Sequence, residues 1–369
     1  MPPFTPSGQA ALDRAIDLHD RAMACQRGQR LDEAGVLAAQ ALVALDAAPD
    51  ARAADAAAIL SNLARIHEAR AEYAQGEDLC RRAVDRLADA GGDDEDIRRL
   101  RVHVLTNLGW LCRCQAKYAE SETLLRQALE LAEGLDQQET ATVLNTLAVL
   151  YKYTGRFGAA RRMYRRALRI IEREGGAEHP DVATVYHNLG GLEHARGRCA
   201  RGEPYARRAV ALREAALGPD HPDVAADKAN LAALLDGQGK YDEAEALYHE
   251  ALAVFERVYG PDHYEIAVNY NNLAAIHDAR GQPDEAERLY RRALAIKERL
   301  LGPDHRDVAV TLNNLGVLLK RQRRFADAEP LLARSVAIFE RALGPDHPDA
   351  QAVRANFEDL RAAEQHDSI

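Results

Sequence analysis

Two consecutive segments of equal length decide the fold of this chain. Residues 221–262 read HPDVAADKANLAALLDGQGKYDEAEALYHEALAVFERVYGPD, and residues 263–304 read HYEIAVNYNNLAAIHDARGQPDEAERLYRRALAIKERLLGPD. Aligned without gaps, the two segments are identical at 22 of 42 positions. Self-similarity at a fixed period of this length is typical of stacked structural repeats.

Each segment contains two amphipathic helical patterns around a tight turn. In the first pattern Leu231 and Leu235 belong to one apolar face. Gly239 then interrupts the helix, and we expect Asp242 to cap the next one. Gly260 supplies a left-handed stop. The second helix carries its own apolar face: Ala244, Leu247, Tyr248, Ala251, Leu252, Phe255 and Val258.

One helix pair makes only a thin core, so the pairs must stack to bury their apolar faces. The core leucine recurs every 42 residues, at Leu147, Leu189, Leu231, Leu273 and Leu315. We therefore predict an all-α protein, a right-handed α-solenoid of eight helix-turn-helix pairs plus a C-terminal capping helix. As one solenoid over 1–369, its pairs span approximately 8–48, 51–91, 95–134, 137–176, 179–218, 221–260, 263–302 and 305–344, with the cap at 347–363. We expect Ser7 to cap the first helix, and disorder before Thr5 and from Glu364 onward.

The repeat also carries a family resemblance. The order of Leu231, Ala232, Gly239, Tyr241, Ala244, Tyr248 and Ala251 resembles the tetratricopeptide repeat. The 42-residue length, the Asn-Leu-Ala core and the LGPDHPDV linker are similar to those of kinesin light chains and of bacterial proteins with the same repeat subtype. The resemblance implies a helical solenoid that binds proteins. No heptad-repeat arm precedes the array, so we do not expect a kinesin subunit.

An asparagine precedes the core leucine in most repeats. The series is Asn62, Asn107, Asn188, Asn230, Asn272 and Asn314; Thr146 interrupts it next to Asn145, and Asn271 and Asn313 double it. An interior Asn costs a helix roughly 0.5 kcal/mol relative to Ala. A carboxamide both donates and accepts hydrogen bonds, as a peptide group does. We therefore expect this column to hold an extended peptide in a concave groove. The kinesin-light-chain resemblance implies the same contact; the alternatives are bonds to a neighbouring helix and simple copying by duplication.

Other first-helix side chains are expected to share that groove. The predicted peptide-binding residues are Asn107, Asn145, His187, Asn188, Asn230, Asn271, Asn272, Asn313, Asn314, Lys152, His194 and Lys320, with Asp278 and Arg321 nearby. Their charges are mixed, so they indicate neither an acidic nor a basic ligand. Kinesin light chains grip peptides in which acidic residues flank a Trp, using basic groove residues; this chain has too few of those to imply the same preference.

Periodic histidines and scattered cysteines raise the question of metal binding. His179, His221, His263, His305 and His347 begin successive repeats, which places them about 10 Å apart, too far to share one ion. We interpret them as structural features of the linker. The five cysteines are Cys25, Cys80, Cys112, Cys114 and Cys199, and we expect reduced structural thiols. No metal site is predicted.

Composition and missing motifs exclude several functional classes. The formal net charge of −10 disfavours a general nucleic-acid binder. The arginines of residues 156–169 are expected to form a solvated convex face, or else a surface for an acidic protein. We find no catalytic motif, cofactor motif, secretory signal or membrane span, and we expect a cytoplasmic, non-enzymatic scaffold for a protein or peptide partner. Two alternatives remain: a homo-oligomeric assembly module, and a sensor or regulatory arm for a separate signalling enzyme.

Overall fold

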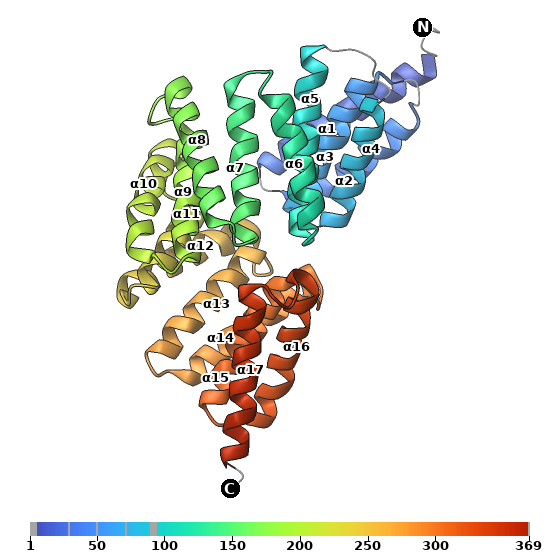
Figure 1. Cartoon of the computed structure of the whole chain (residues 1–369). Coiled ribbons are helices and arrows are strands. Elements are labelled where there is room, and N and C mark those ends of the chain that lie inside the picture. The colour runs from blue at the N-terminus through green and yellow to red at the C-terminus, as the bar shows by residue number, and fades with distance from the viewer. Residues whose placement is uncertain (1–5, 29, 49–50, 71, 89–93, 368–369) are drawn as a thin grey trace. The chain divides into compact units, whose positions relative to one another are not determined.

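The structure is a computed structural model that describes residues 6–28, 30–48, 51–70, 72–88 and 94–367. All seventeen regular elements in these ranges are α-helices (Figure 1). The chain divides into two compact units, residues 1–185 and 186–369. The boundary between Val185 and Tyr186 falls inside helix α9, Pro180–Ala195. Each unit is therefore described separately.

Unit 1 contains four helix pairs and the first part of α9. Its helices are α1 (Pro6–Arg27), α2 (Leu31–Asp46), α3 (Ala53–Ala69), α4 (Tyr73–Ala88), α5 (Glu95–Cys114), α6 (Tyr118–Ala132), α7 (Gln137–Tyr153) and α8 (Phe157–Gly175). Unit 2 contains the rest of α9, followed by α10 (Cys199–Leu217), α11 (Pro222–Asp236), α12 (Tyr241–Tyr259), α13 (Tyr264–Ala279), α14 (Pro283–Leu301), α15 (Arg306–Arg321), α16 (Phe325–Leu343) and α17 (Pro348–Asp367).

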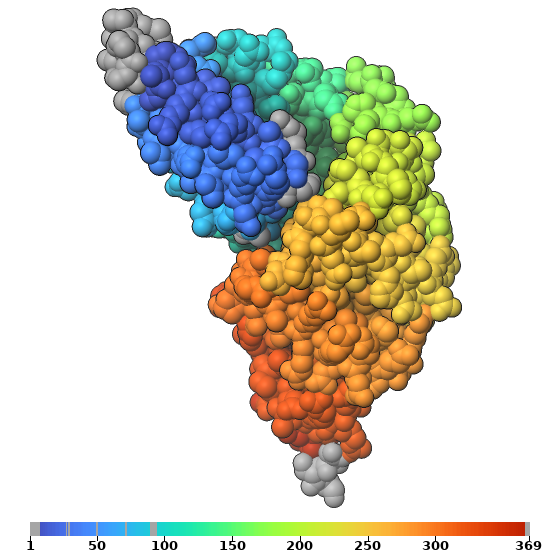
Figure 2. Space-filling view, turned by 180° about the vertical axis from the view of Figure 1, so that it is seen from behind, coloured from blue at the N-terminus to red at the C-terminus, as the bar shows by residue number. Residues whose placement is uncertain are grey.

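Helices within each unit pack in chain order, as expected for a stacked array. Consecutive helices contact one another from α1 to α8 and from α10 to α17. So do first helices along the stack: α3 with α5, α5 with α7, α11 with α13, α13 with α15, and α15 with α17. In the space-filling view of Figure 2, the segments of unit 2 follow one another as successive bands of colour. The solenoid of eight pairs plus a capping helix is thus confirmed. We call the surface made by the first helices the first-helix wall.

Small residues set how closely the helices approach. Gly109 on α5 faces Leu125 on α6, and a Cβ added at Gly109 would lie 2.7 Å from Leu125 Cγ. Gly316 has the same relation to Leu332, at 2.6 Å. Both glycines directly follow a core leucine, where Ala232 stands in the defining repeat. Larger side chains there would push the two helices of a pair apart.

From the fourth pair onward, two turns per repeat use a left-handed residue, usually glycine. Gly239 has φ +74° between the helices of its pair, and Gly260 has φ +76° after the second helix, as predicted. Two residues that carry a Cβ adopt the same conformation at the equivalent of Gly239: Ala116 at φ +60° and Arg323 at φ +62°. These two positions carry backbone strain that glycine would avoid.

The periodic histidines cap the first helices. In each case imidazole Nδ1 accepts the backbone N–H two residues later, at 3.1–3.3 Å, and the five caps are His179, His221, His263, His305 and His347. Their structural interpretation is therefore confirmed. His263 also stacks on Tyr259, with ring centroids 3.9 Å apart, and burial lowers the pKa of His263 to about 4. A neutral imidazole is required, because a protonated Nδ1 cannot accept.

Three predictions about helix ends were wrong. Helix α12 begins at Tyr241, so its N-cap is Lys240 and Asp242 lies inside the helix. Helix α1 begins at Pro6, which places Ser7 within it. Helix α17 continues to Asp367, beyond the expected start of disorder at Glu364. The expected disorder before Thr5 lies outside the described residues.

Candidate functional site: the first-helix wall

A groove of about 410 Å³ opens on the first-helix wall of unit 1. Its lining comes from α3, α5 and α7: Ala58, Ser61, Asn62, Arg65, Leu100, His103, Thr106, Asn107 and Thr142. Asn62 on α3 and Asn107 on α5 therefore line the same groove, whereas Asn145 on α7 is not among its lining residues. We call this cavity the unit 1 groove.

The two groove asparagines are held differently. Asn107 donates from Nδ2 to Ser61 Oγ at 3.0 Å, and Ser61 is buried. Asn62 is partly exposed and forms no hydrogen bond with any described residue. A free carboxamide on a groove wall can bond a peptide group of a ligand without first losing an internal partner.

Unit 2 contains comparable bonds, one to a backbone carbonyl and one to a side chain. Asn230 Nδ2 donates to the His187 carbonyl oxygen at 2.9 Å, and Asn314 Nδ2 donates to Asn271 Oδ1 at 3.5 Å. In each bond the donor precedes the core leucine, and the acceptor residue lies two places before the core leucine of the previous pair. We call this series the amide ladder; its rungs are Asn107–Ser61, Asn230–His187, Asn314–Asn271 and Asn356–Asn313.

The amide ladder matches the alternative interpretation of these asparagines, in which they form hydrogen bonds with a neighbouring helix. Each rung uses one of the two amide donors, and Asn107, Asn230 and Asn314 keep part of their surface exposed. Asn271 is buried, at 8% exposure, and acts as an acceptor within the wall. The sequence analysis missed Asn356, although it lies 42 residues after Asn314 and donates to Asn313 Oδ1 at 2.9 Å.

The remaining predicted residues lie along the same helices. Asn145 and Asn188 are partly exposed, and His194 is exposed. Lys152 Nζ lies 5.4 Å from the Tyr153 ring centre, and Lys320 Nζ lies 3.8 Å from an Asp359 carboxylate oxygen. These side chains remain predicted contacts of a bound segment.

Buried polar groups support the wall of unit 2 from behind. The carboxylate of Asp227, a side chain that is 1% exposed, forms hydrogen bonds with His187 Nδ1 at 2.7 Å and Arg213 Nε at 2.6 Å. This one carboxylate therefore joins α9, α10 and α11. Two repeats later, Lys297 lies 3.0 Å from Thr311 Oγ1, which donates to Asn271 Oδ1 at 3.2 Å. Burial lowers the pKa of Lys297, partly opposed by the charge of Asp307. Sequence reasoning missed these groups, although the positions match at a spacing of 84 residues.

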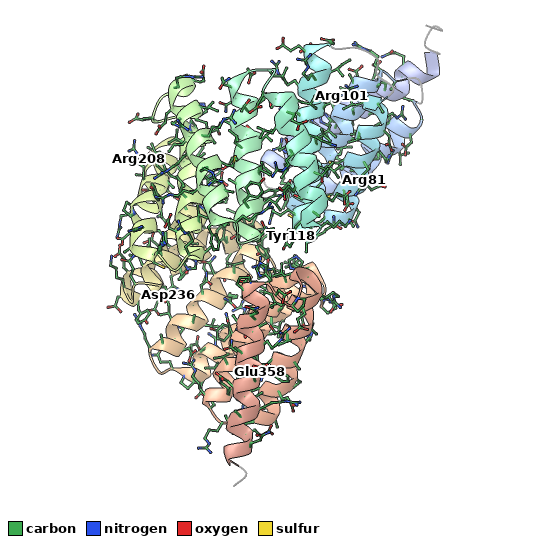
Figure 3. All side chains as sticks on the ribbon, in the orientation of Figure 1. Arg81, Arg101, Tyr118, Arg208, Asp236 and Glu358 are labelled. Atoms are coloured by element: carbon green, nitrogen blue, oxygen red, sulfur yellow. The ribbon has the colours of Figure 1, made fainter. Side chains whose placement is uncertain are left out.

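A second series of interactions, made of hydrogen-bonded ion pairs, involves the second helices of the pairs. Glu122 on α6 bonds Arg156 and Arg126, and Glu203 on α10 bonds Lys240 and Arg207. Hydrogen bonds from these cations lower the pKa of both carboxyls to about 2, with Arg156 and Lys240 as the largest causes. Part of the predicted solvated arginine face is therefore paired between helix pairs. Glu77 is a further member, held by Arg81, which Figure 3 labels on α4.

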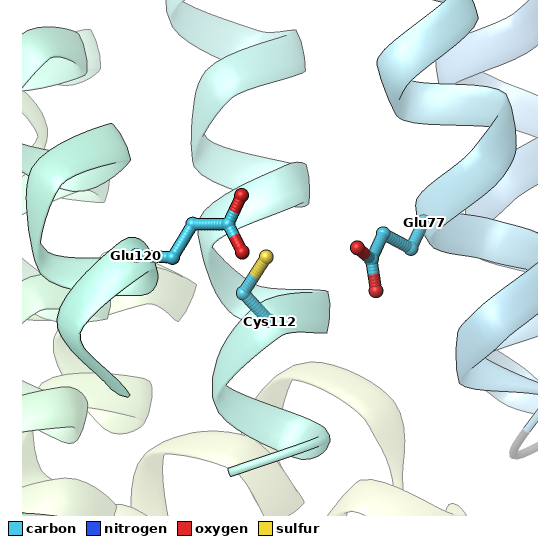
Figure 4. A group of neighbouring side chains, drawn as sticks. All are labelled: Glu77, Cys112 and Glu120. Carbon is cyan, nitrogen blue, oxygen red and sulfur yellow. The ribbon is translucent and has the colours of Figure 1, made fainter. Parts of the chain in front are cut away.

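Glu77 also belongs to a group of three side chains whose potential ligand atoms lie close enough together to bind a metal ion. Glu77, Cys112 and Glu120 approach one another within 4.8 Å from α4, α5 and α6 (Figure 4). The carboxylate of Glu77 already binds Lys117 and Gln115 as well as Arg81. Burial raises the pKa of the Cys112 thiol to about 12, which disfavours the thiolate that a metal needs. We interpret the group as part of the charge pairing between helices.

Comparison with known proteins identifies the family. The tetratricopeptide repeat profile matches residues 55–134, 139–201, 181–247, 226–299, 281–341 and 307–368. The chain belongs to the tetratricopeptide repeat family. No curated protein matches the sequence. Within the described ranges of this family member, no helix is both long and apolar enough to cross a bilayer.

Solved structures show where the fold recurs. A Rap protein in complex with competence and sporulation factor is 16% identical, with 95% of this chain and 98% of that chain covered and a TM-score of 0.60. The apo form of RapI is 14% identical over 77% of this chain and 98% of that chain, with a TM-score of 0.57. A Podosopora anserina putative kinesin light chain with nearly identical TPR-like repeats is 22% identical over 56% and 98%, with a TM-score of 0.43. At these identities, the two Rap structures show similarity of the fold alone.

Proposed function

We propose that this tetratricopeptide repeat protein is a non-catalytic scaffold whose first-helix wall binds an extended segment of a partner protein. The repeats themselves support a protein–protein interaction role. The Rap complex with competence and sporulation factor supports the idea that a solenoid of similar fold can carry a bound factor.

One observation carries the proposal: Asn62 lines the unit 1 groove with a carboxamide that bonds no residue in the described part of the chain. Arg65 and His103 line the same groove, and Thr142 adds a hydroxyl from α7. Such a lining offers donors and acceptors to a peptide backbone, with a cation for an acidic side chain. An extended chain of about five residues spans roughly 17 Å, comparable with two helix-packing distances.

The test is selection from a random twelve-residue peptide display library, followed by titration of the selected peptides. Ala58→Trp fills the unit 1 groove and is expected to weaken binding about tenfold or more. The matched control is Arg208→Trp, which adds the same side chain to the exposed second helix α10 (labelled in Figure 3). Equal binding by wild type and Ala58→Trp would contradict the unit 1 groove as the docking surface.

An apolar surface on the terminal helix pair favours a second candidate function, homo-oligomeric assembly. Ile16, Val36 and Val43 are 40%, 59% and 72% exposed on α1 and α2. Val43 also borders a cavity of about 640 Å³ lined mostly by alanines of these helices. If the protein self-associates through this surface, light scattering should show a dimer. The double variant Val36→Lys with Val43→Lys should then be a monomer. A wild-type monomer at all concentrations would exclude this candidate function.

A further inference from the structure

The second helices carry a column of carboxylates that is interrupted in α8. Fourteen residues after the core leucine, six of the seven pairs from the second onward hold a glutamate: Glu77, Glu122, Glu203, Glu245, Glu287 and Glu329. In four of these helices an arginine four residues later forms an ion pair with the glutamate, as Arg207 does with Glu203. Helix α8 has Arg161 at this position, so Arg165, the equivalent of Arg207, has no carboxylate four residues before it.

Two further arginines of α8 also differ from their equivalents. Arg162 matches Arg288 on α14, which pairs with Glu285, whereas α8 has Ala159 at the position of Glu285. Arg169 stands where four later second helices have alanine: Ala211, Ala253, Ala295 and Ala337. Helix α8 therefore carries six arginines and two glutamates, a formal charge of +4, in a chain whose formal net charge is −10.

Three of these arginines form one exposed stripe. Arg162, Arg165 and Arg169 are three and four residues apart, so they lie on the same face of α8, over about 10 Å. All three are exposed, and none forms an ion pair with a described residue. Arg166 beside them is tied to Glu133 on α6. We call Arg162, Arg165 and Arg169 the α8 arginine stripe.

We propose that the α8 arginine stripe docks an acidic segment of a partner protein, whose Asp or Glu side chains take the place of the glutamate that α8 lacks. A guanidinium presents paired N–H donors that match the two oxygens of a carboxylate. The stripe belongs to a second helix, so this inference goes beyond the first-helix wall and does not depend on it.

Charge complementarity favours an acidic protein segment over a nucleic acid as the occupant. Three cations over about 10 Å neutralise a few carboxylates, whereas a duplex brings one negative charge per ~1.7 Å. The rest of the chain is acidic and repels such a polyanion. A short acidic segment can pair with the stripe without carrying many further charges over the acidic surface.

The test measures how tightly the full chain binds a fluorescent octaglutamate peptide. Exposed ion pairs are individually weak and are screened by salt, so the assay uses low salt, and library peptides selected at physiological salt are not expected at the stripe. The triple variant Arg162→Gln, Arg165→Gln and Arg169→Gln should bind octaglutamate about tenfold more weakly than wild type. Equal binding by the two proteins would overturn the proposal.

The matched control removes three exposed arginines elsewhere and changes the net charge by the same amount: Arg14→Gln, Arg201→Gln and Arg208→Gln. It should weaken octaglutamate binding less than about twofold. The same loss in both triple variants would overturn the proposal, because net charge and not the stripe would then explain binding. The stripe variant should melt within about 2 °C of wild type, since its three arginines pair with no described acid.

Three further measurements exclude other sites and occupants. Ala58→Trp, which fills the unit 1 groove, should bind octaglutamate as wild type does; a loss there would place the peptide in that groove and contradict the proposal. Tighter, stripe-dependent binding of an eight-nucleotide thymidine DNA would make the stripe a nucleic-acid surface instead. A dimer at low salt that the stripe variant abolishes would make a second copy of this chain the occupant.

Discussion

The first-helix walls of the two units share the repeated asparagine but hold it differently. In unit 1, Asn62 lines a groove and bonds no described residue, while Asn107 beside it donates to Ser61. In unit 2, Asn230 and Asn314 both donate to the preceding pair, to the backbone carbonyl of His187 and to the side chain of Asn271. An asparagine of the column that bonds an acceptor of the preceding pair ties two pairs together, and our proposal assigns docking to the one that does not.

The largest expected loss of stability comes from removing the buried carboxylate that supports the first-helix wall of unit 2. Asp227→Ala leaves Arg213 and His187 without their shared carboxylate, and removing one partner of a buried ion pair costs about 3–5 kcal/mol. Urea unfolding of the full chain measures it. The double variant Asp227→Leu with Arg213→Met removes both charges and should recover most of the lost stability. If stability is not recovered, lost packing and not an unpaired buried charge explains the effect of Asp227→Ala.

Protonation of the histidine caps is the next largest effect. Unfolded His263 takes up a proton near pH 6.5 and the folded residue only near pH 4, so the unfolded state binds more protons between these values and stability falls as pH falls through this window. After allowance for partial exposure, we expect a loss of ~2 kcal/mol. Denaturant unfolding across pH 7 to 4 measures it.

The control for that titration is His263→Asn, a capping residue that does not titrate in this range. It should flatten the slope between pH 6.5 and 4. Glu122 and Glu203, with folded pKa values of about 2, contribute stability that is lost only below pH 4.5, so the two windows are distinct. An unchanged slope in His263→Asn would contradict the capping account.

A smaller effect sharpens the contrast between tied and free asparagines. Asn107→Ala removes a bond to buried Ser61 and should destabilise the protein by about 1 kcal/mol. Asn62→Ala breaks no hydrogen bond to a described residue and replaces Asn with a better helix former, so it should stabilise the protein by about 0.5 kcal/mol. Thermal unfolding of both variants is the measurement, and a loss of stability in Asn62→Ala would show a structural role that the unit 1 groove does not reveal.

The smallest effect concerns the turn between paired helices. Ala116→Gly relieves a left-handed alanine and should stabilise by about 0.5–1 kcal/mol, whereas Gly239→Ala at the equivalent turn should destabilise by a similar amount. No other atom lies within 4 Å of a Cβ built at Gly239, so the change tests backbone strain alone. Equal signs for the two substitutions would rule out that explanation.

Sequence periodicity predicted the fold well because the local signals in each repeat all indicate the same pair of helices. The apolar spacing, the turn glycines and the 42-residue period all predicted the observed pairs. Caps were harder: Asp242 has the right chemistry, yet Tyr241 already belongs to the helix, because residue type alone does not place a helix start. The histidine caps were predicted only as linker features.

The placement of the asparagines on the first helices was predicted from the sequence, but their hydrogen bonds were not. The asparagine column lies on the first helices as expected, yet no pattern in one repeat shows that Asn230 bonds the repeat before it. That information is non-local: it requires comparing residues two and four places before successive core leucines. Such a comparison would have paired Asp227 with His187.

The central claim is that the first-helix wall is a docking surface, and a crystal structure of the protein with a library-selected peptide tests it most directly. The account predicts an extended peptide that lies across the first helices of unit 1, with a hydrogen bond to Asn62 in the unit 1 groove. A peptide bound on the second helices, or on the apolar surface of α1 and α2, would contradict it.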